Sequence, residues 1–124
     1  MDLLLRIPVA FVTLFLLDMA WFAASSPLYA SVVTKRPINR IAAAAVWLLL
    51  ALAVAGQRPR PTRWTDAAAY GSLVGLVVYG VYNGTNYAIL ADWPIHVALA
   101  DTAWGCVVCG AAAVAVHFAA TALH

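Results

Sequence analysis

Four long apolar runs follow one another along the chain, and a short polar segment separates each from the next. At about 1.5 Å of rise per helical residue, runs of this length approach the 30 Å thickness of a bilayer's hydrocarbon core. A backbone inside hydrocarbon must satisfy its own hydrogen bonds, which favours helices. The pattern therefore predicts an all-α protein, a single domain over residues 1–124 with four transmembrane helices in an antiparallel bundle. The expected spans are 3–24, 38–56, 67–91 and 95–123.

The polar segments between the runs predict loops and helix ends. Asp92-Trp93-Pro94 predicts a tight turn, because the residue before a proline is disfavoured in helical space. Pro27 is expected to kink or end the first helix, and Thr65-Asp66 to cap the third. A cleaved signal peptide is the alternative for the first run, and Asp18 inside that run argues against it.

Charge at the helix ends predicts the orientation. If all four runs cross, four basic residues lie on the side of the amino terminus and three on the other side, so we expect both termini in the cytoplasm. The four are Arg6, Arg58, Arg60 and Arg63, and the three are Lys35, Arg36 and Arg40.

Composition supports an integral membrane protein. Hydrophobic residues make up 65% of the chain and charged residues 10%, whereas soluble domains carry about a quarter charged residues. Seven basic against five acidic residues is too slight an excess for nucleic-acid binding. The sequence contains no nucleophile–base set, phosphate loop or zinc-protease motif. We therefore expect no enzyme, no cofactor and no metal site.

Polar residues interrupt the apolar pattern at one level of the predicted bundle. Tyr79, Tyr82, Asn83 and Asn86 follow the spacing i, i+3, i+4, i+7, which places them on one helix face. Asp18 lies toward the carboxyl end of the first helix and Asp101 toward the amino end of the fourth. Trp21 and Trp104 accompany them in a shared Asp-x-Ala-Trp pattern. In an alternating bundle these three helices bring their polar groups together, and the second helix is expected to contribute nothing polar.

This polar cluster has two interpretations. A carboxylate in hydrocarbon is costly unless it is paired, hydrogen-bonded or protonated. Asp18 and Asp101 could accept hydrogen bonds from neighbouring hydroxyl, amide and indole groups and so hold the helices together, which is a purely structural role. Alternatively, the cluster lines an aqueous pocket that binds a polar or cationic ligand, or a proton.

Glycines recur at four-residue spacing in the third run. Small residues at this spacing let helix backbones approach closely, so the glycines are candidate helix-packing positions. They are Gly71, Gly75, Gly80 and Gly84.

The cysteines and histidines are weaker candidates. Cys106 and Cys109 share one apolar helix, where two small buried hydrophobic residues are the simpler interpretation. His96 and His117 lie about 30 Å apart at helical rise and cannot share a metal or a haem.

The ordered motifs resemble one known family. Leu17-Asp18-x-x-Trp21, Tyr79-Gly80-x-Tyr82-Asn83-x-Thr85-Asn86, Asp92-Trp93-Pro94 and Asp101-x-Ala103-Trp104-Gly105 together resemble the DUF2177 family of small predicted membrane proteins. In that family an Asp-Leu pair usually stands where this chain has Asn83-Gly84. The resemblance implies a four-helix membrane protein with no assigned reaction.

Two functions follow from these observations. The first is a non-catalytic accessory subunit of a larger membrane assembly or homo-oligomer, because a helix face lined with glycine allows another helix to pack closely against it. The alternative is a proton- or cation-linked small transporter, or a ligand-binding membrane protein, that uses Asp18 and Asp101. An intramembrane enzyme ranks third because no catalytic set can be named. The lipid bilayer is the one partner common to all three.

Overall fold

The computed structural model describes residues 2–33 and 37–123, and these residues form four helices. The all-α prediction is confirmed. Lys35 and Arg36 of the predicted basic loop lie outside the described residues. The helices are α1 (Leu3–Tyr29), α2 (Arg40–Ala55), α3 (Trp64–Ile89) and α4 (Ile95–Ala122).

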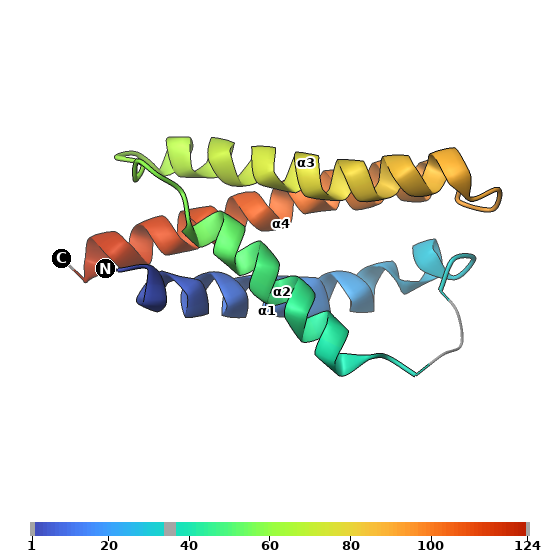
Figure 1. Cartoon of the computed structure of the whole chain (residues 1–124), viewed down its shortest axis with the longest axis horizontal. Coiled ribbons are helices and arrows are strands. Elements are labelled where there is room, and N and C mark those ends of the chain that lie inside the picture. The colour runs from blue at the N-terminus through green and yellow to red at the C-terminus, as the bar shows by residue number, and fades with distance from the viewer. Residues whose placement is uncertain (1, 34–36, 124) are drawn as a thin grey trace.

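Helix α4 is the centre of the arrangement. It contacts each of the other three helices, and its contact with α3 is the most extensive. Successive helices run in opposite directions, so both ends of the chain lie at the same end of the molecule (Figure 1). Helices α1, α3 and α4 extend along the long axis of the molecule, whereas α2 runs obliquely across α1 (Figure 1).

Two helix ends differ from the expected ones. Of the two outcomes expected at Pro27, a kink or a helix end, the helix end is wrong, because α1 continues to Tyr29 although a proline nitrogen has no hydrogen to donate. Thr65-Asp66 does not cap α3, which begins one residue earlier at Trp64 with Arg63 as its N-cap residue. Asp66 lies in the first turn and forms an ion pair with Arg63 at 3.1 Å (Nε to Oδ2). The carboxylate still lies at the helix amino end, where the helix dipole favours negative charge.

The helices differ in their capacity to cross a membrane. Among the described residues, α1 and α4 are long and apolar enough to do so. Helix α2 begins at Arg40, where Asn39 caps it by accepting a hydrogen bond from Ala42 N at 3.0 Å. Its 16 residues extend about 24 Å, which is short of the hydrocarbon core.

Glycines bring α3 and α4 into backbone contact. A Cβ added at Gly75 would overlap the carbonyl oxygen of Gly105, and one added at Gly71 would overlap that of Cys109. Both glycines therefore pack α3 on α4 within the chain. Gly80 meets only the Thr102 methyl group, at 3.8 Å, and Gly84 has open space within 4 Å.

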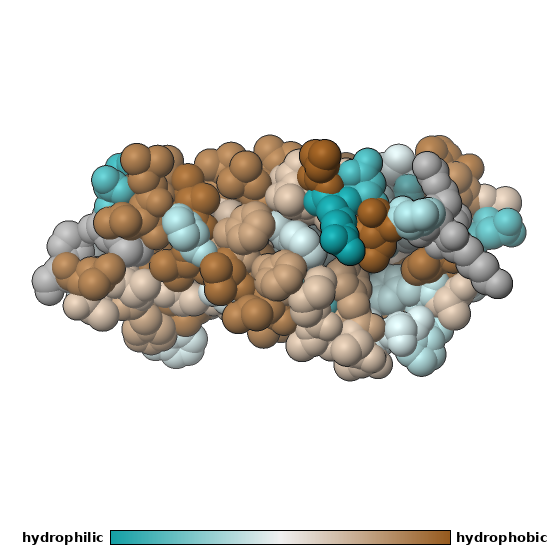
Figure 2. Space-filling view, turned by 90° about the horizontal axis from the view of Figure 1, so that it is seen from below, coloured by the Kyte–Doolittle hydropathy of each residue, from teal (hydrophilic) through white to brown (hydrophobic). Residues whose placement is uncertain are grey.

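The core consists of small residues and the surface of large apolar ones. Ala10, Ala51, Val108 and Ala112 are buried at the helix contacts. Leucine, isoleucine and valine side chains on all four helices are exposed, and apolar residues cover most of the face shown in Figure 2. This inversion of the usual pattern is expected where lipid, rather than water, is the surrounding solvent.

Candidate functional site

Asp18 accepts hydrogen bonds from two indole groups on two other helices. Trp47 of α2 donates its Nε1–H to Oδ2 at 2.8 Å, and Trp104 of α4 donates its Nε1–H to Oδ1 at 2.8 Å. Asp18 is only 5% exposed. One buried carboxylate thus connects α1, α2 and α4.

Asp101 has a similar arrangement with different donors. The Tyr29 hydroxyl of α1 donates to Oδ1 at 2.6 Å, and the Asn83 amide of α3 donates to Oδ2 at 2.6 Å. The same Asn83 nitrogen also lies 2.9 Å from the backbone oxygen of Tyr79. The Asn83 Oδ1 atom is buried and has no hydrogen-bond partner among the described residues.

Two tryptophans join the carboxylates into one network. The Trp21 ring lies parallel to the Trp104 ring, with centroids 4.7 Å apart and 6° between the planes. Trp21 also donates its Nε1–H to the Tyr29 hydroxyl at 2.9 Å. A continuous path therefore leads from Asp18 through the two tryptophans and Tyr29 to Asp101. All four helices contribute to this network, which we call the Asp18–Asp101 network.

Two members of the network were not among the predicted site residues. The expectation that the second helix contributes nothing polar is wrong, because an indole N–H counts as apolar in a hydropathy pattern yet donates well. Tyr29 was missed because Pro27 was expected to end or kink the helix. A helix that continues through Pro27 places Asp18, Trp21 and Tyr29 at i, i+3 and i+11, which is one face.

The remaining predicted residues lie at or beyond the edge of the network. Tyr79 contributes its backbone oxygen, and its ring packs on Gly105, where a Cβ would overlap it. Tyr82 is 56% exposed and its ring meets Trp93 edge-on, with centroids 5.9 Å apart. Asn86 is half-buried and forms no side-chain hydrogen bond within residues 2–33 and 37–123.

A half-open groove is lined by residues of α2 and α3 and by Asp101 of α4. Its volume is about 390 Å³. We call it the Asp101 groove, and its lining residues are Val46, Leu50, Val78, Tyr79, Tyr82 and Asp101. Asp101 is the one ionisable carboxyl among these residues, so the groove combines an apolar wall, two phenol rings and a carboxylate.

In the described part of the chain, no positively charged group donates a hydrogen bond to either carboxylate of the network. Every donor to Asp18 and Asp101 is a neutral indole, hydroxyl or amide group. Within the described part of the chain the one salt bridge joins Arg63 and Asp66, and neither residue belongs to this network. The arrangement can therefore hold a proton or an organic cation against a carboxylate.

The cysteines and histidines lie outside the Asp18–Asp101 network. Among the described residues, no group of three His, Cys, Asp or Glu side chains is placed to hold a metal ion. Cys106 and Cys109 are both free thiols, and Cys109 is buried in the core. His96 is exposed, and His117 lines a different pocket at the other end of α4.

Comparison with known families identifies the chain. It belongs to DUF2177, a family described as predicted membrane protein, whose model matches residues 3–118. The resemblance seen in the motifs is thereby confirmed. No curated protein and no solved structure matches the chain.

Proposed function

We propose that this DUF2177 protein binds an amphiphilic organic cation in the membrane, with the cationic group at Asp101 and the apolar part in the Asp101 groove. The observation that carries this proposal is that a carboxylate lines a groove of about 390 Å³ whose other lining residues are aliphatic or aromatic. Binding would be the first step of a cation-linked transporter. No catalytic step, cofactor, metal or nucleic acid is required.

Charge favours a cationic ligand. Asp101 has a neutral donor on each oxygen, and a carboxylate at low dielectric is costly without a counter-charge. A ligand cation beside Asp101 in the groove would offset this cost. An anionic ligand of the same shape would increase it.

The groove walls favour an aromatic or alkyl cation over a small inorganic one. Val46, Leu50 and Val78 offer apolar contact, while Tyr79 and Tyr82 offer aromatic side chains. A cation over an aromatic face gains about 0.5–2 kcal/mol, depending on desolvation. A strongly hydrated metal ion gains little from such a wall.

The topology that we propose has four crossings with both termini in the cytoplasm. The two ends of the chain lie together, and consecutive helices run in opposite directions (Figure 1). Asp101 lies in the second turn of α4. In this orientation the groove is near the outer leaflet, where an amphiphile can enter from the lipid between α2 and α3.

An accessory role in a membrane assembly or homo-oligomer, which the sequence alone placed first, becomes the second hypothesis. The glycines that suggested it, Gly71 and Gly75, contact α4 of the same chain. They are therefore not available to a partner helix. Gly84 has open space within 4 Å.

A charge-reversed pair of probes tests the proposal. Tetraphenylphosphonium and tetraphenylborate have nearly the same shape and opposite charge. We expect the protein in lipid nanodiscs to bind the phosphonium saturably in equilibrium dialysis and the borate only through the lipid. Asp101→Asn should weaken phosphonium binding about tenfold or more, the scale of losing one charged interaction.

A matched control separates the site from general charge effects. Asp92→Asn makes the same chemical change at an exposed carboxylate in the α3–α4 turn, and we expect unchanged phosphonium binding. Equal binding by the wild type, Asp92→Asn and Asp101→Asn would overturn the proposal, provided that all three keep the same helix content. Phosphonium uptake into proteoliposomes then distinguishes a transporter from a binding protein.

A further inference from the structure

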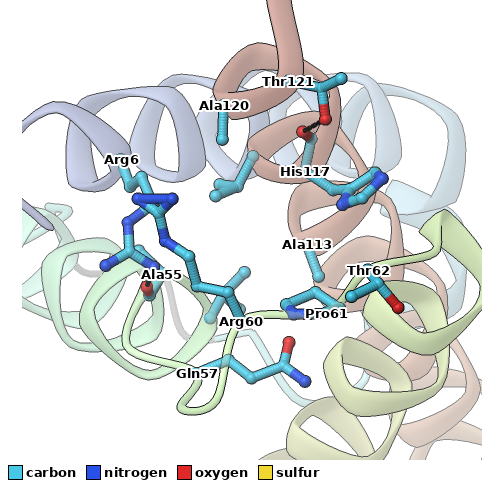
Figure 3. A pocket seen from close by; sticks show the side chains of 12 residues that line it. Arg6, Ala55, Gln57, Arg60, Pro61, Thr62, Ala113, His117, Ala120 and Thr121 are labelled. Atoms are coloured by element: carbon cyan, nitrogen blue, oxygen red, sulfur yellow. Dashed lines mark hydrogen bonds between the residues drawn. The ribbon is translucent and has the colours of Figure 1, made fainter. Parts of the chain in front are cut away.

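Basic residues surround a second pocket at the opposite end of the molecule from the Asp101 groove. Its volume is about 170 Å³, and it lies where the chain between α2 and α3 meets α1 and α4 (Figure 3). This is room for several waters, enough for a phosphate group of five heavy atoms. The polar lining residues are Arg6, Gln57, Arg60, Thr62, His117 and Thr121.

Arg6 is a buried cation with unused hydrogen-bonding capacity. Its residue is 3% exposed, and its Nη1–H donates to the backbone oxygen of Ala55 at 2.8 Å. Its Nε–H is buried and has no partner in the described part of the chain. A buried donor without an acceptor is costly, and a buried guanidinium more so. An anionic acceptor beside this Nε–H would satisfy the donor and offset the buried charge.

The charge around Arg6 is predominantly positive. Arg60 lines the same pocket, and Arg58 and Arg60 both lie within electrostatic range of Arg6. Asp2 is the acidic group within range, but it is exposed and its carboxylate caps α1 by accepting from Leu5 N at 3.2 Å. Two guanidinium groups face one pocket, as Figure 3 shows for Arg6 and Arg60.

The rest of the wall mixes polar and apolar residues (Figure 3). His117 and Thr121 come from the last turns of α4, and Gln57 and Thr62 from the α2–α3 connection. The Thr121 hydroxyl donates to the His117 backbone oxygen at 2.9 Å, so its oxygen can still accept. Val54, Ala113 and Val116 add apolar contacts. An anion attached to an apolar body would match both kinds of lining residue.

We infer that this pocket binds a phosphate group, contacted by the Arg6 and Arg60 guanidinium groups. Arginine presents paired N–H donors that match phosphate oxygens in a bidentate manner. The pocket lies at the ends of α1 and α4, the two helices apolar enough to cross a membrane. This is the level of lipid headgroups, so an anionic phospholipid is the natural source, with soluble phosphate as the other source of the same chemistry.

Thermal unfolding of the purified full-length protein in detergent micelles tests the inference. Sodium phosphate is titrated in one series at constant ionic strength, and phosphatidic acid is mixed into the micelles in a second. Phosphatidylcholine replaces phosphatidic acid in the reference series. We expect a saturable rise in unfolding temperature in at least one phosphate series. A rise with phosphatidic acid alone identifies a lipid headgroup, and a rise with sodium phosphate identifies free phosphate as a ligand.

Three arginine variants decide whether the pocket is responsible. Arg60→Gln removes an exposed guanidinium from the pocket and should weaken the apparent affinity about tenfold or more. Arg63→Gln removes an exposed arginine that pairs with Asp66 and should leave the affinity unchanged. Arg6→Gln should act like Arg60→Gln if it folds. No saturable shift in either phosphate series, or equal affinities of Arg60→Gln and Arg63→Gln, would overturn the inference. Cation binding in the Asp101 groove is tested separately and does not depend on this result.

Discussion

The indole rings of Trp21 and Trp104 lie parallel, 4.7 Å apart between centroids, and connect two carboxylates that are 83 positions apart in the sequence (101 − 18). Each ring belongs to one Asp-x-Ala-Trp segment. Trp104 donates to Asp18 in the other segment, and Trp21 reaches Asp101 through the Tyr29 hydroxyl. The repeated pattern thus marks two segments that bind each other across the α1–α4 contact.

Trp104→Phe should destabilise the protein by about 1–2 kcal/mol, because a ring remains for Trp21 to stack on while Asp18 loses one of two donors. Unfolding by sodium dodecyl sulfate in mixed micelles measures the change. Trp64→Phe is the matched control, since Trp64 is 52% exposed and lies in the first turn of α3. Equal destabilisation by both substitutions would contradict the role given to Trp104.

Tyr29→Phe should cost about 1 kcal/mol and should be coupled to Asp101. The substitution removes the hydroxyl that donates to Asp101 at 2.6 Å and accepts from Trp21. In a double-mutant cycle with Asp101→Asn, we expect a coupling free energy of about 0.5–2 kcal/mol in the same micelle assay. Tyr87→Phe, at an exposed tyrosine, should show none. Additive effects of Tyr29→Phe and Asp101→Asn would contradict the hydrogen-bonded path from Trp21 through Tyr29 to Asp101.

Gly75→Ala and Gly84→Ala should change stability in opposite directions. An added methyl group at Gly75 overlaps the Gly105 carbonyl oxygen, so α3 must move away from α4 at a cost of roughly 2 kcal/mol or more. At Gly84 nothing lies within 4 Å, and alanine gains up to about 1 kcal/mol in helix propensity. Unfolding curves of both variants measure the two signs. A destabilised Gly84→Ala protein would instead indicate a partner packed at that position.

Tyr82→Leu should weaken tetraphenylphosphonium binding about fivefold and leave stability nearly unchanged. Tyr82 lines the Asp101 groove with a 56% exposed side chain, so leucine keeps the apolar wall but removes the ring face. Tyr82→Phe keeps the ring and should bind like the wild type. Equilibrium dialysis in nanodiscs measures both. If Tyr82→Phe loses as much affinity as Tyr82→Leu, then the hydroxyl, rather than the ring, is responsible.

Sequence patterns predicted the four helices and the meeting of three polar segments. Asp18, Asn83 and Asp101 each interrupt an apolar run, and the alternation of helices places them at one level. Trp47 was not predicted as a member of the network because a hydropathy pattern does not record the hydrogen-bond donor of an indole ring. Gly71 and Gly75 were recognised as packing positions, but their spacing is the same for contacts within and between chains.

The phosphate pocket was not predictable from the sequence in the same way. Arg6 and Arg60 were counted only as charges that set the orientation of the chain. Their proximity depends on how residues 56–63 fold back against the ends of α1 and α4. The spacing of polar and apolar residues along the chain does not predict how this segment folds back.

The most direct test of the Asp101 groove is to locate a bound cation chemically. A benzophenone carrying a quaternary ammonium group is photo-crosslinked to the protein in nanodiscs, and the modified peptides are mapped by mass spectrometry. We predict labelling at residues 46–50 of α2 and 78–82 of α3, suppressed by excess tetraphenylphosphonium and lost in Asp101→Asn. Labelling spread evenly over the exposed apolar surface, insensitive to the competitor and to Asp101→Asn, would contradict cation binding at this site.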